Sequence, residues 1–241
     1  HKTRLNNSLL LWGGLAGLAG SILMASHFTS ISDAFEGIGQ ELLNAVILFS
    51  ISALLAFYLF LFIRYSQLTS NTERIIKLII LLIVFLAVMR EGVEIIIYIS
   101  GYFTNLSDNS SLIIGASIGA WIGISAGILI YYGLLYFPPK VRLNVIIFEA
   151  IILSAGKASE GILYLIQADW IESGLPLWDS SFIIEESSII GQLLYATFAY
   201  EARPSGVQVA VYILTFISIL LAVSYGKRLN KIALNKETIS L

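Results

Sequence analysis

The sequence contains no cysteine and only two histidines, and charged residues make up 12% of its 241 positions. The lack of cysteine excludes disulfides, thiolate metal sites and cysteine nucleophiles. Soluble domains are about one-quarter charged, so the composition also excludes an ordinary soluble globule. The 14 Lys and Arg against 16 Asp and Glu give a net charge of −2 with no basic run, which excludes a basic nucleic-acid-binding protein. The sequence shows no nucleophile–base pair and no nucleotide loop, so we do not expect an enzyme.

Apolar sequence is abundant instead, with 57% hydrophobic residues. An α-helix needs about 20 apolar residues to cross the hydrocarbon of a bilayer. Stretches of this kind predict an all-α, polytopic bundle of transmembrane helices, with the whole chain, 1–241, as a single transmembrane domain. The six predicted spans are 8–26, 41–63, 76–100, 112–137, 145–167 and 207–225.

Lysine and arginine are distributed unevenly between the loops. If the spans alternate across the membrane, eleven of these residues fall on one side and only Arg203 lies in the loops of the other. Because loops rich in Lys and Arg stay in the cytoplasm, both visible ends of the chain, including the tail 226–241, are predicted to be cytoplasmic. We expect a plasma membrane location, in bacteria the inner membrane.

The long connection 168–206 is predicted to be external and acidic, and it includes the adjacent carboxylates Glu185 and Glu186. Apolar residues at helical spacing between positions 182 and 200 predict a helix lying on the outer surface. Two interpretations of this segment stay open, a solvated lid and a vestibule that collects cations.

Three ionisable residues stand together inside the third span, in the string Arg90-Glu91-Gly92-Val93-Glu94. Each ionisable group at the bilayer centre costs about 2.5–3.5 kcal/mol, so such a group indicates a functional site. Glu91 and Glu94 share a helix face, and Arg90 can pair with Glu94 four positions away. One positive charge against two carboxylates leaves a negative charge for a proton or a cation, so both glutamates should face the bundle interior. The alternative is a buried ion pair that fixes helix packing.

The fifth span contains a second, weaker set of ionisable residues. Glu149 and Glu160 are eleven positions apart and lie on one helix face, with Gly156 between them. Lys157 and Glu160 can form a structural pair at i,i+3. Glu149, near the inner end, fits either a solvated carboxylate or a place on a pathway. Because the spans contain no His or Cys, any metal would be held by oxygen ligands, which suit iron, manganese, magnesium and calcium.

Two similar strings, Phe-Glu-Gly-Ile at 35–38 and Phe-Glu-Ala-Ile at 148–151, predict an inverted repeat. The first string lies at the outer start of a span and the second at the inner start of another, an arrangement typical of transporters. The repeat would comprise three helices plus one, so we expect a further span upstream of 8–26 and seven in all. Glycines spaced by four, including Gly17 and Gly119, predict close helix packing.

Three strings carry a resemblance to a known family: Arg-Glu-Gly-Val-Glu at 90–94, Phe-Glu-Gly-Ile at 35–38 and Tyr-Glu-Ala-Arg-Pro at 200–204. With these strings the sequence resembles the high-affinity, oxidase-dependent iron permeases of fungi and bacteria. That family has seven spans with an Arg-Glu-x-x-Glu signature in the first and fourth, so the resemblance implies that the first span is missing here. It also implies import of iron as ferric ion, delivered by an oxidase or a periplasmic protein, with iron as the substrate and no cofactor. The candidate iron ligands are then Glu36, Glu91, Glu94 and Glu149, supported by Arg90, Lys157, Glu160, Glu185 and Glu186.

Two other functions are compatible with these residues. One is a proton-coupled carrier of an organic cation, with Glu91 or Glu94 as proton relay, and metal-dependent uptake would separate it from an iron permease. The other is a non-transporting membrane subunit whose charges bind a partner chain. If neutralising Glu91 abolished assembly with the partner but left transport intact, that result would favour the non-transporting subunit.

Overall fold

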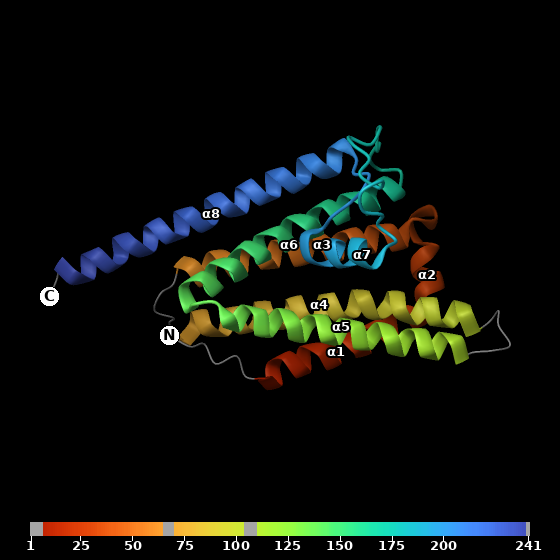
Figure 1. Cartoon of the computed structure of the whole chain (residues 1–241), viewed down its shortest axis with the longest axis horizontal. Coiled ribbons are helices and arrows are strands. Elements are labelled where there is room, and N and C mark those ends of the chain that lie inside the picture. Colours follow the sequence, from red (N-terminus) through yellow and green to blue (C-terminus); the bar gives the residue numbers. More distant parts are fainter. Residues whose placement is uncertain (1–6, 65–69, 104–109, 240–241) are drawn as a thin grey trace.

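The chain forms an elongated bundle of helices (Figure 1). The computed structural model describes residues 7–64, 70–103 and 110–239, and in these ranges the all-α prediction is confirmed. The elements are α1 (Asn7–Ser26), α2 (Phe28–Ser32), the 3-10 turn η1 (Ala34–Gly37), α3 (Gly39–Arg64), α4 (Ser70–Phe103), α5 (Ser110–Tyr136), α6 (Pro139–Gln167), α7 (Ile189–Phe198) and α8 (Gly206–Ile239).

The six long helices coincide with the six predicted spans. Helices α1, α3, α5 and α8 are long and apolar enough to cross a membrane. Helices α4 and α6 have 34 and 29 residues and so also exceed the length of about 20 that a span needs. They contain the intramembrane ionisable residues that the sequence indicates as functional. Helix α8 does not end near 225 but continues to Ile239, because the lysines, leucine and alanine that follow are good helix formers.

Helix α3 packs on α6, α4 and α8 and lies at the centre of the bundle. One apolar cluster joins three of these helices, with Leu59 and Ile63 from α3, Ile147 and Ile151 from α6, and Ile219 and Val223 from α8. Burial of these side chains stabilises this half of the bundle.

Near their middles, α3 and α6 exchange a pair of hydrogen bonds. The Ser52 hydroxyl donates to the Ser154 carbonyl at 2.8 Å, and the Ser154 hydroxyl donates to the Ser52 carbonyl at 2.9 Å. The two helices run in opposite directions (Figure 1), so this contact has the two-fold character that an inverted repeat would produce. The matching strings do not mark equivalent positions, because 35–38 lies in the turn before α3 and 148–151 lies inside α6. The repeat itself stays a prediction.

The glycine pattern has different outcomes in α1 and α5. A Cβ on Gly17 would lie 2.8 Å from Val88 Cβ, so α1 packs closely on α4 as predicted. In α5 a Cβ would have nothing within 4 Å at Gly115, Gly119, Gly123 or Gly127. The prediction of close packing is therefore wrong for the glycines of α5 among the described residues, because the space that they face is open.

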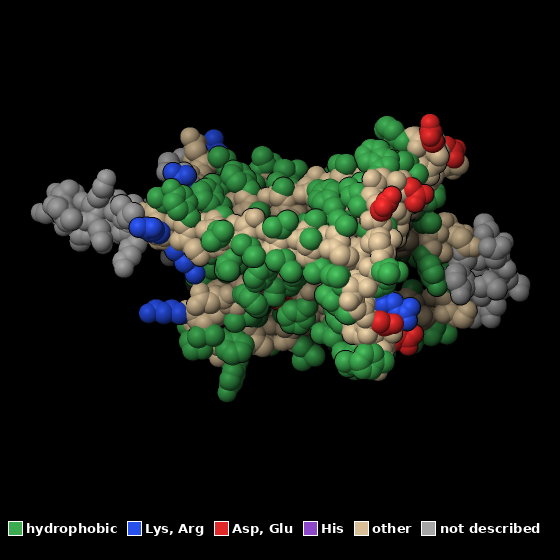
Figure 2. Space-filling model, turned by 90° about the horizontal axis from the view of Figure 1, so that it is seen from above, with side chains coloured by type: hydrophobic (Ala, Val, Ile, Leu, Met, Phe, Trp, Pro, Cys, Tyr) green, Lys and Arg blue, Asp and Glu red, His purple; other side chains and the backbone are tan. Residues whose placement is uncertain are grey.

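The segment 168–206 folds back onto the bundle. Ser188 caps the start of helix α7, where its hydroxyl accepts from the Gly191 amide at 3.0 Å, and Ala199, whose φ of 52° is left-handed, caps the end. A Cβ on Gly156 would overlap Ala199, so the end of α7 lies against the middle of α6. A helix thus occurs where one was predicted, and its end packs beside the middle of α6. Figure 2 shows most of the visible Lys and Arg at one end of the bundle and the visible Asp and Glu at the other.

Candidate functional site

Arg90, near the middle of α4, is the centre of the main charged cluster. Its side chain is 6% exposed, and its Nη1 donates to Glu91 Oε1 at 2.5 Å. Its Nη2 lies 3.0 Å from Glu94 Oε1, so the predicted i,i+4 pair is confirmed. One buried guanidinium therefore contacts both carboxylates of the motif, in the multidentate geometry that favours arginine over lysine.

Helix α6 completes the cluster with three residues on one face. Glu160 is as buried as Arg90, and its Oε1 accepts from Arg90 Nη2 at 2.6 Å. Its other oxygen accepts from Lys157 Nζ at 2.7 Å, which confirms the predicted pair. The Tyr164 hydroxyl accepts from Arg90 at 3.1 Å and donates to Glu94 at 3.3 Å. These positions are three and four apart, so they project from α6 together.

The two glutamates of the motif are much more exposed than the arginine, with 58% of the Glu91 side chain and 45% of the Glu94 side chain accessible. Glu94 and Tyr98 border a cavity of about 880 Å³ between α4 and α5. Glu91 lies on the same side of α4, because it is seven residues, about two turns, before Tyr98. Glu94 thus borders the cavity, Glu91 is exposed on the same side of α4, and neither carboxylate is packed in the core.

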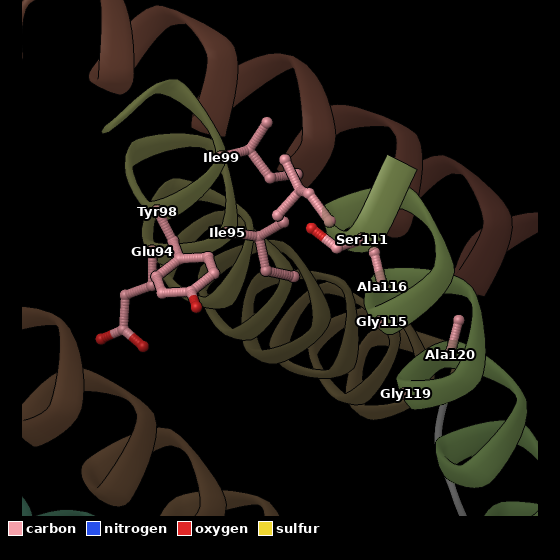
Figure 3. Close-up of a pocket in the computed structure, with 10 residues that line it drawn as sticks. Glu94, Ile95, Tyr98, Ile99, Ser111, Gly115, Ala116, Gly119 and Ala120 are labelled. Carbon is pink, nitrogen blue, oxygen red and sulfur yellow. The ribbon is translucent and has the colours of Figure 1, made fainter. Parts of the chain in front are cut away.

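Helix α5 forms the opposite wall of this cavity mainly with small residues. Figure 3 shows Glu94 and Tyr98 close together on α4, with the Glu94 carboxylate directed away from the α5 ribbon. The α5 residues of the wall are Ser111, Leu112, Gly115, Ala116, Gly119 and Ala120. Short side chains leave the volume open between α5 and the part of α4 that includes Glu94.

The structure does not bring the other two candidate ligands to this site. Glu36 lies exposed in η1, before α3, with a left-handed φ of 65°. Glu149 is half-buried in α6 between Ile147 and Ile151, which pack on the far end of α3. Glu36 and Glu149 therefore lie near opposite ends of α3. Within the described ranges, no three acidic or histidine side chains form a ready-made metal-binding group.

The external segment has its own carboxylates. Glu185 and Glu186 are exposed, and Glu186 accepts a hydrogen bond from the Ala202 amide. Hydrogen bonds from Ser181 and Arg203 lower the pKa of Asp179 to about 2. Burial, with Glu186 and Glu160 nearby, raises the pKa of Glu201 to about 7, although Gln208 donates to its carboxylate at 2.6 Å.

Sequence reasoning did not identify three residues around the cluster. Tyr164 bridges Arg90 and Glu94, Tyr195 of α7 lies against Glu160, and Glu201 is held by α8. The four-residue spacing from Glu160 to Tyr164 could have indicated the first. No local pattern indicates the other two, since they depend on how the external segment folds back.

Comparison with known proteins gives one family. The model of the iron permease FTR1 family matches residues 3–236. The ferrous iron permease EfeU of Shigella flexneri serotype 5b is 26% identical over 156 residues, 62% of this chain and 63% of that protein. The ferrous iron permease EfeU of Escherichia coli O157:H7 is also 26% identical over 156 residues, 62% of this chain and 54% of that protein.

These alignments span between about half and 63% of the relatives' own length. No solved structure matches the chain. The match to the family model is much longer than these pairwise alignments and includes every helix of the cluster described above. The chain is a helical membrane protein and belongs to the iron permease FTR1 family.

Proposed function

We propose that this protein imports iron through the cavity between α4 and α5, with Glu91 and Glu94 as ligands along the path. The observation that supports this most strongly is the separation of charge at the motif. Glu94 borders the cavity and Glu91 is exposed on the same side of α4, whereas the guanidinium that pairs with both is buried.

The ligand chemistry suits an ion that must be bound and then released. Carboxylate and hydroxyl oxygens are hard ligands, which iron accepts. A small number of ligands in a wide cavity favours entry without trapping the ion, as conduction requires. The small residues of α5 leave space for a partly hydrated ion beside Glu94.

We propose the direction of transport from the opposite charges at the two ends of the bundle. The basic end is cytoplasmic by the positive-inside rule, so the acidic end with Glu185, Glu186 and Glu201 is external. External carboxylates would raise the local cation concentration before entry. For a bacterium we propose the inner membrane, with an oxidase or a periplasmic protein as the partner that delivers the iron.

The central experiment is uptake of radioactive iron by variants of the full-length protein. Glu91→Gln and Glu94→Gln keep the side-chain size but remove the charge, and we expect each to abolish uptake while leaving membrane insertion intact. Glu73→Gln is the matched control, because Glu73 also lies on α4 and pairs with a residue four positions on, at 2.6 Å. Wild-type uptake by either motif variant would refute a role for α4 in the pathway.

A second arm of the uptake experiment concerns the valence of the iron. The family resemblance implies ferric ion from an oxidising partner, whereas the similar enterobacterial proteins carry the name ferrous iron permease. We propose the ferric form for this chain. Uptake that persists under strong reductant, and that needs no oxidising partner, would assign ferrous iron instead.

A further inference from the structure

Glu160 is a buried carboxylate that pairs two cations. It is 5% exposed, and its two oxygens accept from different side chains, Arg90 at 2.6 Å and Lys157 at 2.7 Å. A buried carboxylate costs several kcal/mol in desolvation unless it is paired, and these two contacts pair both of its oxygens. Neither iron binding nor the motif on α4 requires a glutamate at this position of α6.

The effect of Glu160 on Arg90 is positional. Arg90 Nη2 reaches toward α6, and the Arg90 side chain is 6% exposed, against 58% for Glu91 and 45% for Glu94. The positive charge is thereby drawn to the side away from the cavity. An ion in the cavity would meet Glu94, which borders it, before the buried guanidinium of Arg90.

Lys157 has a different effect, which concerns the net charge of the cluster. The cluster has three carboxylates, on Glu91, Glu94 and Glu160, and two cationic side chains, Arg90 and Lys157. Its formal charge is therefore −1. Without Lys157, the cluster would have two net negative charges and would bind a cation more tightly. Stronger binding slows release, which limits the transport rate.

We propose that Glu160 and Lys157 form a positioning pair for the iron site. Glu160 holds Arg90 against α6, behind the two ligands, and Lys157 limits the net negative charge that the passing ion meets. This inference rests on the proposed function, since it assigns the pair a role in iron transport through Glu91 and Glu94.

The pair is tested by uptake measured across iron concentrations in three variants. Glu160→Gln keeps an oxygen acceptor but removes the charge, so the half-saturating iron concentration should rise about tenfold or more. Lys157→Met adds net negative charge, so this concentration should fall while the maximum rate also falls. The double variant restores one net negative charge, and its half-saturating concentration should return to within about threefold of wild type.

The double variant separates the effect of net charge from simple packing. If the pair only stabilises the fold, removing both partners lowers the amount of protein in the membrane and does not move the half-saturating concentration toward wild type. Rescue by the double variant supports the proposal, and its absence overturns it. If Glu160→Gln does not insert, Lys157→Met alone decides, because an unchanged or higher half-saturating concentration contradicts the charge argument.

Two controls make the outcome specific. The pair Glu73 and Lys77 has the same charges and an N–O distance of 2.6 Å but lies outside the cluster, so neutralising it should leave both kinetic parameters unchanged. Glu94→Gln is measured in parallel. Full uptake by Glu94→Gln would refute the proposed function, whereas lost uptake in Glu94→Gln without rescue in the double variant would refute the positioning role alone.

Discussion

Two glycine substitutions with the same chemistry should have opposite effects on stability. Gly17→Ala places a methyl group 2.8 Å from Val88 Cβ and 2.9 Å from the Phe85 carbonyl oxygen. Gly119→Ala places the same group in the cavity beside α5, with nothing within 4 Å. Both glycines lie inside long apolar helices, so the difference between the variants reports the packing of α1 on α4.

The magnitude follows from two opposing terms. Replacing a helix-interior glycine with alanine favours the helix by about 1 kcal/mol in either place. Overpacking at Gly17 costs about 1–3 kcal/mol, because the contact includes a backbone oxygen that cannot rotate away. We expect Gly17→Ala to be less stable than Gly119→Ala by about 1–3 kcal/mol. For a chain of this size that is a difference of about 2–12 °C in melting temperature.

The assay is thermal unfolding of the two purified variants in the same detergent, with the wild-type protein alongside. The Gly119→Ala variant should melt at or above the wild-type temperature, and Gly17→Ala below it. Equal shifts in the two variants would refute the reasoning, and so would a larger loss at Gly119, which would show that the α5 face is occupied.

Two further predictions concern other contacts. Ser52→Ala and Ser154→Ala should each lower stability by about 0.6 kcal/mol in the detergent assay, since each removes one interhelical hydrogen bond. A double variant as stable as the wild type would contradict a stabilising role for the two exchanged hydrogen bonds. The raised pKa of Glu201, about 7 against an ordinary value of 4.5, means that its contribution to stability is complete below about pH 4.5 and is lost as the pH rises through 7. Proteolysis of the segment 168–206 should therefore be faster at pH 8 than at pH 6, and Glu201→Gln should remove that difference; an unchanged pH dependence in that variant would assign it to another group.

The spans and the local ion pairs were predictable from the sequence. A run of about 20 apolar residues has few structures available in a bilayer, so the six helices follow from composition and length. The contacts of Arg90 with Glu94 and of Lys157 with Glu160 follow from helix geometry alone, because residues three or four apart are neighbours on a helix. These predictions needed no knowledge of which helix packs on which.

The contacts that define the site were not predictable in this way. Arg90 and Glu160 are 70 positions apart, and their bond depends on how α4 and α6 approach one another. The fold-back of α7 depends on Gly156, whose missing side chain makes room for Ala199. The glycines of α5 show that spacing alone does not predict packing. They have the same four-residue spacing as the glycines that pack α1 on α4, but they face open space.

The exchanged serine pair has a practical consequence in a chain without cysteine. The two hydroxyl oxygens of Ser52 and Ser154 lie 3.1 Å apart, at the middle of two helices that run in opposite directions. Cysteines introduced at these two positions would be the only thiols in the chain printed here. A disulfide between them would join α3 to α6 at their crossing without touching the cavity side of α4. Oxidation and reduction could then report whether iron passage requires these two helices to move against each other.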